Sequence, residues 1–205
     1  MKAKSFFRYS NGQDAFTDLL FNALLGFTSM FTIAFVLISE PSKAGKVDDK
    51  AEFLITVRWP DNHPDDVDTI IEDPRGNLLW YQNKDTALMH LDRDDRGILR
   101  DRIEIDGIEV ANPINQETAS LRSIVAGEYV VNLLHYKSNF AKPLPVSVKV
   151  EKLNPEVSLV YYGNHDLSGA GSEVTAVRFT LNGEGEPIGI NALQKSLLTR
   201  VVQAK

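Results

Sequence analysis

The feature that most limits what this chain can fold into is a run of twenty residues without a charge, from Leu19 to Ile38. The run reads LLFNALLGFTSMFTIAFVLI. A helix rises about 1.5 Å per residue, so a helix of this length matches a hydrocarbon core of about 30 Å. The sequence therefore predicts a transmembrane helix over residues 19–38.

A cleaved signal peptide is the main alternative for this segment. Ser42 and Ala44 provide a weak small-x-small cleavage site. However, the apolar run is longer than the about 7–15 residues of a signal peptide. Asp14 and Asp18 also stand at its start, where a signal peptide is basic. We therefore favour a membrane anchor.

Charge is distributed unequally on the two sides of the run. Residues 1–18 carry three basic and two acidic side chains, whereas residues 39–205 carry 19 basic and 26 acidic ones. The positive-inside rule then predicts a cytoplasmic N-terminal segment, residues 1–18, and a C-terminal domain on the outer side of the membrane.

The remainder of the chain has the pattern of a β protein. Residues 39–50 combine Pro, Gly, Ser and charge in the manner of a linker. Short runs rich in β-branched and aromatic residues follow, separated by turn residues. The fold class predicted is mostly β: a single N-terminal transmembrane helix followed by an antiparallel β-sandwich over residues 51–205. The segment 190–205 is compatible with a short helix or a further strand. The other predicted strands are 51–59, 67–73, 77–83, 120–125, 128–136, 144–153, 157–163 and 173–181.

Several classes of function are excluded by what the sequence lacks. The net charge is −6, which disfavours nucleic-acid binding. The chain has no cysteine, so thiol nucleophiles and Cys-type zinc sites are excluded. Its four histidines, at positions 63, 90, 135 and 165, show no H-x-x-x-H spacing. P-loop, G-x-S-x-G and dinucleotide motifs are absent as well, so we do not expect an enzyme.

A polar stripe runs along the predicted membrane helix. Asp14, Asp18, Asn22, Ser29 and Thr32 follow one another at spacings of 4, 4, 7 and 3 residues. On a helix with 3.6 residues per turn, these spacings place the five side chains within about 80° of one another around the helix axis. A carboxylate at the bilayer centre costs about 2.5–3.5 kcal/mol, so Asp18 is expected to face a protein partner or an ion path. Asp14 lies farther out, where solvation among lipid headgroups is an equal alternative.

These residues resemble a known group of membrane proteins. The stretch DLLFNALLGF, Asp18 to Phe27, is similar to the membrane segment of the MotB, ExbD, TolR and ZorB group of ion-driven motor subunits, in which an aspartate opens a single span. The resemblance implies that Asp18 carries the coupling ion, a proton or sodium, with no other cofactor. It also implies a homodimer whose two helices sit inside a ring of five MotA/ExbB/TolQ-like multi-span subunits. The chain would then lie in a bacterial inner membrane, with its C-terminal domain in the periplasm.

The outer domain departs from that group and resembles another. It has neither an OmpA-type peptidoglycan-binding pattern nor that of the compact αβ domain of ExbD, so the envelope target is not indicated. The segments 65–81, 90–97 and 126–136 are instead similar to sandwich domains of the DUF2135 and YfaP kind, which carry D-x-D, D-P-x-G and D-x-D-D-x-G motifs.

Six aspartates of this region form a candidate Ca²⁺ site, because oxygen-rich loops are what Ca²⁺ prefers. The alternative is that they form turns and solvated loop tips, which is the simpler interpretation. The six are Asp66, Asp68, Asp73, Asp92, Asp94 and Asp95.

Two functions follow from these patterns. The first is a MotB/ExbD-like subunit of a proton- or sodium-driven rotary motor, which couples ion flow through Asp18 to force on an envelope target. The alternative is a membrane-tethered periplasmic module that recognises a protein or a glycan, with the helix acting only as an anchor.

Overall fold

The structure is a computed structural model that describes residues 12–39, 50–97 and 102–203. The chain divides into two compact units, Met1–Val47 and Asp48–Lys205. The predicted cytoplasmic segment up to residue 11 and the linker from 40 to 49 lie outside the described residues.

The first unit contains one long helix, α1 (Gly12–Ser39). Within it, Ala15–Phe35 is long and apolar enough to cross a membrane. This window begins four residues before the predicted span and includes Asp18. Every side chain described in the helix, from residue 15 to 35, is exposed. Large apolar side chains are exposed along α1, which is consistent with a helix that crosses a membrane.

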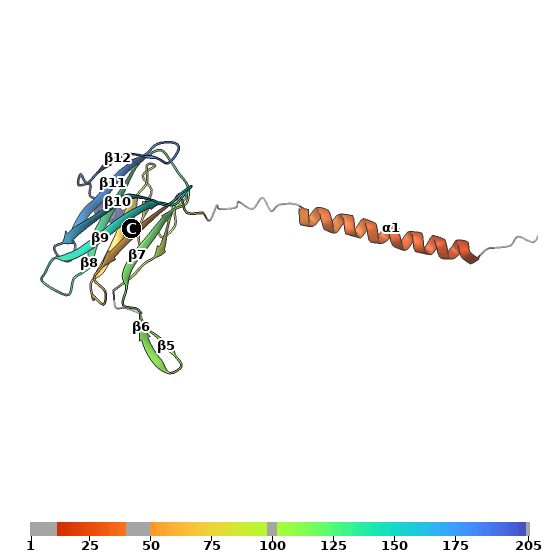
Figure 1. Ribbon diagram of the computed structural model, residues 1–205, viewed down its shortest axis with the longest axis horizontal. Helices are drawn as coiled ribbons and strands as arrows, with labels where there is room; N and C mark the ends of the chain where they lie inside the picture. Colours follow the sequence, from red (N-terminus) through yellow and green to blue (C-terminus); the bar gives the residue numbers. More distant parts are fainter. Residues whose placement is uncertain (1–11, 40–49, 98–101, 204–205) are drawn as a thin grey trace, which may run out of the picture. The chain divides into compact units, whose positions relative to one another are not determined.

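The second unit is an antiparallel β-sandwich, as the sequence predicts (Figure 1). One sheet has the strand order β10-β9-β1-β7-β4, and the facing sheet has the order β12-β11-β8-β2-β3. The first sheet comprises β1 (Phe53–Trp59), β4 (Met89–Arg93), β7 (Asn115–Leu121), β9 (Leu144–Lys152) and β10 (Ser158–Leu167). The second comprises β2 (Asp66–Glu72), β3 (Leu78–Leu79), β8 (Gly127–Lys137), β11 (Glu173–Leu181) and β12 (Pro187–Asn191).

The core lies between the two sheets. Alternate residues of β1 point inward, namely Phe53, Ile55, Val57 and Trp59, and all four are buried. They pack against inward residues of the facing sheet such as Tyr129, whose ring stacks on Phe179 at 5.2 Å. Because the side-chain period of a strand is two, this alternation fixes which face of each strand is buried.

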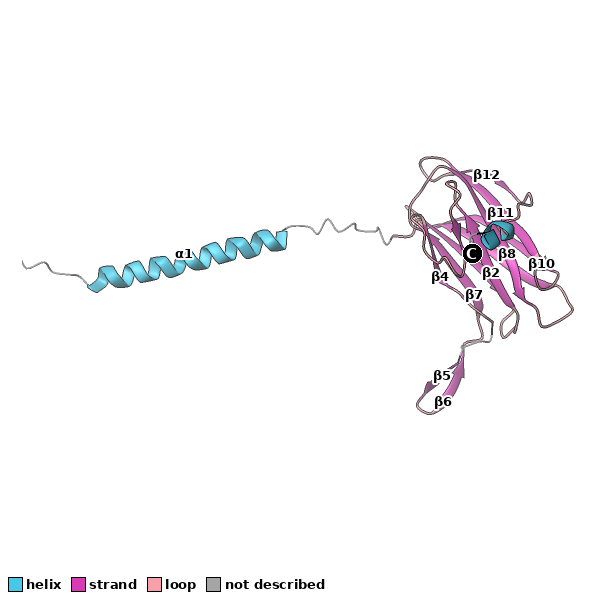
Figure 2. Cartoon of the chain, turned by 180° about the vertical axis from the view of Figure 1, so that it is seen from behind, coloured by secondary structure: helices cyan, strands magenta, loops and turns pink. Residues whose placement is uncertain are grey.

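A second, smaller apolar cluster lies on the outer face of the β8–β2 sheet. The short helix α2 (Leu198–Gln203) lies over this face in Figure 2. Its Val201, together with Leu197 just before it, packs against Ile70 and Leu134. Of the two alternatives predicted for the segment 190–205, the structure contains the short helix, and β12 (Pro187–Asn191) ends at the start of this segment.

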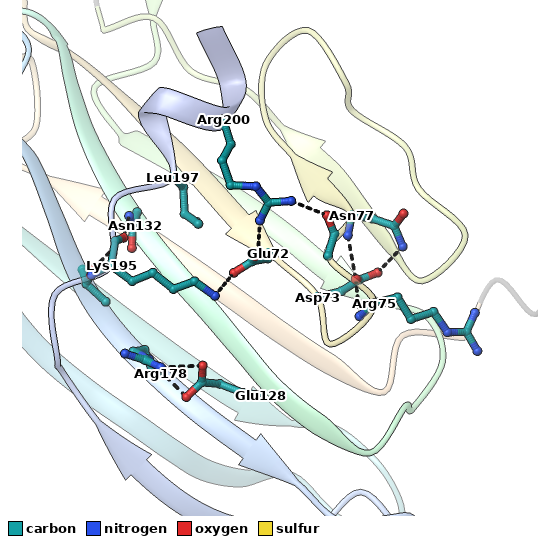
Figure 3. A network of polar contacts seen from close by, with 12 residues as sticks. Glu72, Asp73, Arg75, Asn77, Glu128, Asn132, Arg178, Lys195, Leu197 and Arg200 are labelled. Carbon is teal, nitrogen blue, oxygen red and sulfur yellow. Dashed lines mark hydrogen bonds and ion pairs between the residues drawn. The ribbon is translucent and has the colours of Figure 1, made fainter. Parts of the chain in front are cut away.

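Polar contacts hold this C-terminal segment in place. Glu72 on β2 accepts bonds from Lys195 and Arg200, as Figure 3 shows. Glu173 accepts from the backbone N–H groups of Leu197 and Leu198 at 2.7 and 3.0 Å, which caps the start of α2.

A two-stranded hairpin, β5 (Arg102–Ile105) and β6 (Ile108–Ala111), protrudes from one end of the sandwich (Figure 1). Asp106 and Gly107 form its turn with positive φ angles, as a two-residue hairpin loop requires. The hairpin was not predicted, and neither were β4 and β12.

The predicted strand over residues 120–125 is wrong. The strand is β7, which ends at Leu121, and its inward positions include Asn115 and Glu117. These buried polar side chains interrupt the apolar alternation by which a strand is recognised in a sequence.

Candidate functional site

The polar stripe of α1 is present on the helix. Asp18, Asn22, Ser29 and Thr32 all lie in α1 with exposed side chains. Asp14 also falls within the helix, but its side chain lies outside the described residues. Thr32 donates its hydroxyl hydrogen to the carbonyl of Thr28 at 2.7 Å, so its own helix already satisfies this group.

The second candidate site is a pocket of about 280 Å³ in the sandwich. It combines three carboxylates with two cationic side chains and two tyrosines. Its lining residues are Asp66, Asp68, Tyr81, Asp94, Arg96, Tyr136 and Lys137.

Two β-bulges shape this pocket. Between β4 and β7 the register shifts around Asp92, and between β2 and β8 it shifts so that Tyr136 is the extra residue. A bulge bends its strand and redirects the neighbouring side chains. The bulge in β4 directly precedes Asp94, and the bulge in β8 brings Tyr136 to the pocket wall beside Tyr81, at a ring separation of 5.7 Å.

Glu117 joins the cluster from the facing sheet. Its side chain is only 1% exposed, and its Oε2 accepts a hydrogen bond from the backbone N–H of Thr69 at 2.7 Å. At this point β2 has no strand on its outer side, because β3 pairs only with Ile71 and Glu72. Glu117 therefore bonds to the open edge of β2.

Oxygen atoms of Asp68, Asp94 and Glu117 all lie within 4.8 Å of one another. Asp94 also accepts a bond from Lys84, with its Oδ2 2.6 Å from the Nζ atom, and Arg96 lies 3.9 Å from the same oxygen. Glu117 was missed in the sequence because a lone glutamate inside a strand matches no motif.

Burial and mutual repulsion shift the protonation of these groups. Burial, reinforced by Asp94, raises the pKa of Asp66 to about 6. Burial, together with the charges of Asp66 and Asp94, raises the pKa of Asp68 to about 7. The pKa of Glu117 is raised by its complete burial and by Asp68. Asp66 and Asp68 therefore exchange protons near neutral pH.

The three remaining predicted aspartates do not join the cluster. Asp73 accepts bonds from the N–H groups of Arg75 and Asn77, which is its role in the D-P-x-G turn. Asp95 is buried and accepts from Arg93, Gly97 and Gln116. Asp92 is exposed at the bulge in β4.

Gly97 closes the acidic loop next to the pocket. Its φ angle is +66°, and a Cβ atom at this position would lie 2.7 Å from the carbonyl oxygen of Asp65. A side chain is therefore excluded here both by conformation and by space. This explains the glycine that ends the D-x-D-D-x-G motif.

The chain thus combines an apolar helix able to span a membrane with a β-sandwich that holds a carboxylate-lined pocket. No protein-family model, no curated protein and no solved structure matches it.

Proposed function

We propose that this protein is a single-pass subunit of an ion-driven rotary motor in a bacterial inner membrane. Its helix pair would sit inside a ring of MotA/ExbB/TolQ-like subunits and couple proton or sodium flow through Asp18 to force on an envelope target. The observation that carries this proposal is a carboxylate, Asp18, within the apolar window Ala15–Phe35.

The energetics of the bilayer support this role. Insertion of an aspartate costs about 2.5–3.5 kcal/mol at the membrane centre, which is an upper limit for Asp18 near one end of the window, and aspartates within membrane spans almost always face a protein interior or an ion path. Asn22 lies one turn deeper on the same face, and Ala23 and Gly26 allow a neighbouring helix to approach closely. Movement of one charge through 100 mV supplies about 2.3 kcal/mol, enough to bias the rotation of one helix against another.

The test is Asp18→Asn, which keeps the size and hydrogen-bonding capacity of the side chain and removes its charge. We expect the variant to co-purify with the multi-span ring protein, while the protonophore-sensitive output of the system in cells is lost. Asp18→Glu should retain part of that output, because a carboxylate remains. Asp14→Asn is the matched control and should reduce the output less.

A second readout examines the carboxyl group directly. In membranes that contain the assembled complex, dicyclohexylcarbodiimide should modify Asp18, and mass spectrometry should find no adduct at position 18 in Asp18→Asn. If cells carrying Asp18→Asn keep the full protonophore-sensitive output, Asp18 is not the coupling residue and the motor proposal fails.

The alternative function, a membrane-tethered binding module, is favoured by one feature of the sandwich. The β5–β6 hairpin presents Ile103, Ile105, Ile108 and Val110 on one face, where they are 41–67% exposed. Exposed apolar patches of this kind mark protein-binding surfaces. Normal output from Asp18→Asn, together with loss of output on replacement of these residues by threonine, would support the tethered module.

A further inference from the structure

The carboxylate cluster has buried oxygen atoms that no described group satisfies. Asp66 Oδ1, Asp68 Oδ2 and Glu117 Oε1 are all buried, and none has a hydrogen-bond partner among the described residues. The three side chains are 9%, 5% and 1% exposed. Asp68 and Glu117 belong to the same close group of carboxylates, and Asp66 lines the pocket beside Asp68. Buried polar atoms in native proteins are almost always paired, so these orphaned acceptors indicate a missing ligand.

The cationic side chains around the pocket do not supply that ligand. Lys84 and Arg96 both approach Asp94. Lys137 and Arg96 influence Asp66 only through their charge. Within the described parts of the chain, no lysine or arginine nitrogen lies within 4.0 Å of Asp66, Asp68 or Glu117. Asp66, Asp68 and Glu117 therefore have no direct ion pair among the described residues, although Arg96 and Lys137 line the same pocket.

The carboxyl groups of Asp68, Asp94 and Glu117 also lie close together, with oxygen atoms within 4.8 Å of one another. Ionised carboxylates this close repel one another in a buried setting, and a bound cation would remove that repulsion.

We propose that Asp66, Asp68, Asp94 and Glu117 bind one Ca²⁺ ion at this edge of the sandwich. Two of the ligands come from β2 in one sheet and two from the β4–β7 side of the other. The ion would tie the open edge of β2 to the facing sheet. This inference rests on the sandwich alone and does not depend on the role of Asp18.

The donor set favours Ca²⁺ over other metals. All four ligands are carboxylates, and the described metal-ligand cluster contains no histidine, which disfavours zinc. Ca²⁺ binds oxygen at about 2.3–2.6 Å, so two ligands on opposite sides of the ion are about 5 Å apart. Oxygens of Asp68, Asp94 and Glu117 all lie within 4.8 Å of one another, close enough to share one such ion. Mg²⁺ needs shorter bonds, of about 2.1 Å, in strict octahedral geometry.

The cluster has room for additional ligands. Asp94 Oδ2 is occupied by Lys84, so Asp94 would bind the ion through its other oxygen. The pocket of about 280 Å³ can hold water molecules, which commonly complete the six to eight positions around Ca²⁺.

The test uses the full chain in detergent micelles, stripped with a chelator and then titrated with CaCl₂ or MgCl₂ at pH 7.5. Both tryptophans, Trp59 and Trp80, are in the sandwich, so their fluorescence reports the unfolding of this unit alone. We expect Ca²⁺ to release measurable heat and to raise the Tm, and MgCl₂ to raise it less.

Glu117→Gln is the decisive variant. A glutamine keeps an acceptor for the N–H of Thr69 but has no charge. We expect the Kd for Ca²⁺ to rise at least about tenfold. We also expect the Tm in chelator to exceed that of the wild type, because a buried charge has been removed. Asp92→Asn is the matched control in the same acidic motif, and its Ca²⁺ affinity should be unchanged.

Two results would overturn the proposal: a wild-type chain that shows neither heat nor a Tm shift with Ca²⁺, or a Ca²⁺ response that Asp92→Asn abolishes and Glu117→Gln retains. Should Glu117→Gln fail to fold, Tb³⁺ luminescence on the wild type provides an independent measurement. Tyr81 and Tyr136 line the pocket and can sensitise a bound Tb³⁺ ion. Emission that CaCl₂ displaces supports the site, and the lack of such emission refutes it.

Discussion

Glu117 has two roles at the edge of the sandwich. One of its oxygens accepts the N–H of Thr69 on β2, the other is buried without a hydrogen-bond partner, and the carboxyl group lies close to those of Asp68 and Asp94. A leucine here would pack well between the sheets but would leave the N–H of Thr69 without a partner. The carboxyl group of this glutamate is therefore retained although its charged form is costly to bury, and that cost predicts a dependence of stability on pH.

The raised pKa values of Asp66, Asp68 and Glu117 predict that stability falls as the pH rises. Folded Asp68 has a pKa of about 7, against 3.8 for the unperturbed group, so between these values the folded chain binds more protons than the unfolded chain. The free energy of unfolding must then fall as the pH rises through this interval and level off above it. Asp66 and Glu117 act in the same direction.

We therefore predict that Asp68→Asn gains stability relative to the wild type as the pH rises. In the presence of a chelator, the difference between their free energies of unfolding should grow by about 2–3 kcal/mol from pH 5 to pH 8. Burial lowers the pKa of His165, so this residue makes the free energy of unfolding rise with pH. His165 is present in both proteins, so its contribution cancels in the difference between them. Urea unfolding followed by tryptophan fluorescence measures the free energy of unfolding of each protein. A difference that stays constant from pH 5 to pH 8 would contradict the prediction.

Among the elements, α2 and the segment before it are held by polar anchors as well as by the apolar contacts of Leu197 and Val201. The helix has only six residues, which is too short to be stable by itself. Glu173 accepts two backbone N–H groups at its start, the hydroxyl of Ser196 at 2.6 Å and the amide of Asn132 at 2.7 Å. Burial opposes the charge of Glu173, but these four bonds outweigh it and lower its pKa.

Glu173→Ala should therefore detach the C-terminal segment from the sheet. We expect the free energy of unfolding at pH 7 to fall by about 2–3 kcal/mol, because buried N–H groups lose their acceptor. Amide hydrogen exchange at Leu197 and Leu198 should rise before global unfolding. Glu109→Ala is the control, since Glu109 forms an exposed ion pair with Arg102 in the hairpin, and its effect should stay below about 0.5 kcal/mol. Equal effects of the two variants would argue against an anchoring role for Glu173.

For the whole molecule, the two proposals concern separate units of the chain. Asp18 belongs to the unit Met1–Val47, and the carboxylate cluster belongs to Asp48–Lys205. Asp18→Asn should accordingly leave the Ca²⁺ response of the sandwich unchanged. Glu117→Gln should in turn leave co-purification with the ring protein intact, so the two proposals can fail independently.

Membrane topology can be tested directly, because the chain contains no cysteine. We predict that Ser42→Cys in intact cells or spheroplasts reacts with a membrane-impermeant thiol reagent, whereas Ser5→Cys reacts only after the membrane is permeabilised. The expectation follows from the net charge of +1 before the apolar run, over residues 1–18, and of −7 after it, over residues 39–205. The reverse pattern of labelling would place the sandwich in the cytoplasm and rule out a periplasmic function.

The sequence by itself determined the class of each part of the chain. A run of apolar residues long enough to cross a bilayer and strands with alternating apolar positions are local patterns, and local geometry decides their consequences. The turn role of Asp73 was also readable, because D-P-x-G forms its bonds within five residues.

Only the tertiary structure decided which acidic side chains meet. Asp68 and Glu117 are 49 residues apart in the sequence and belong to different sheets, and they come together because β2 has an open edge there. Two β-bulges, which a sequence pattern does not reveal, bring in Asp94 and Tyr136 while Asp92 remains exposed. Adjacent residues of one motif thus have different roles, because the packing of the two sheets, and not the spacing along the chain, sets the direction of each side chain.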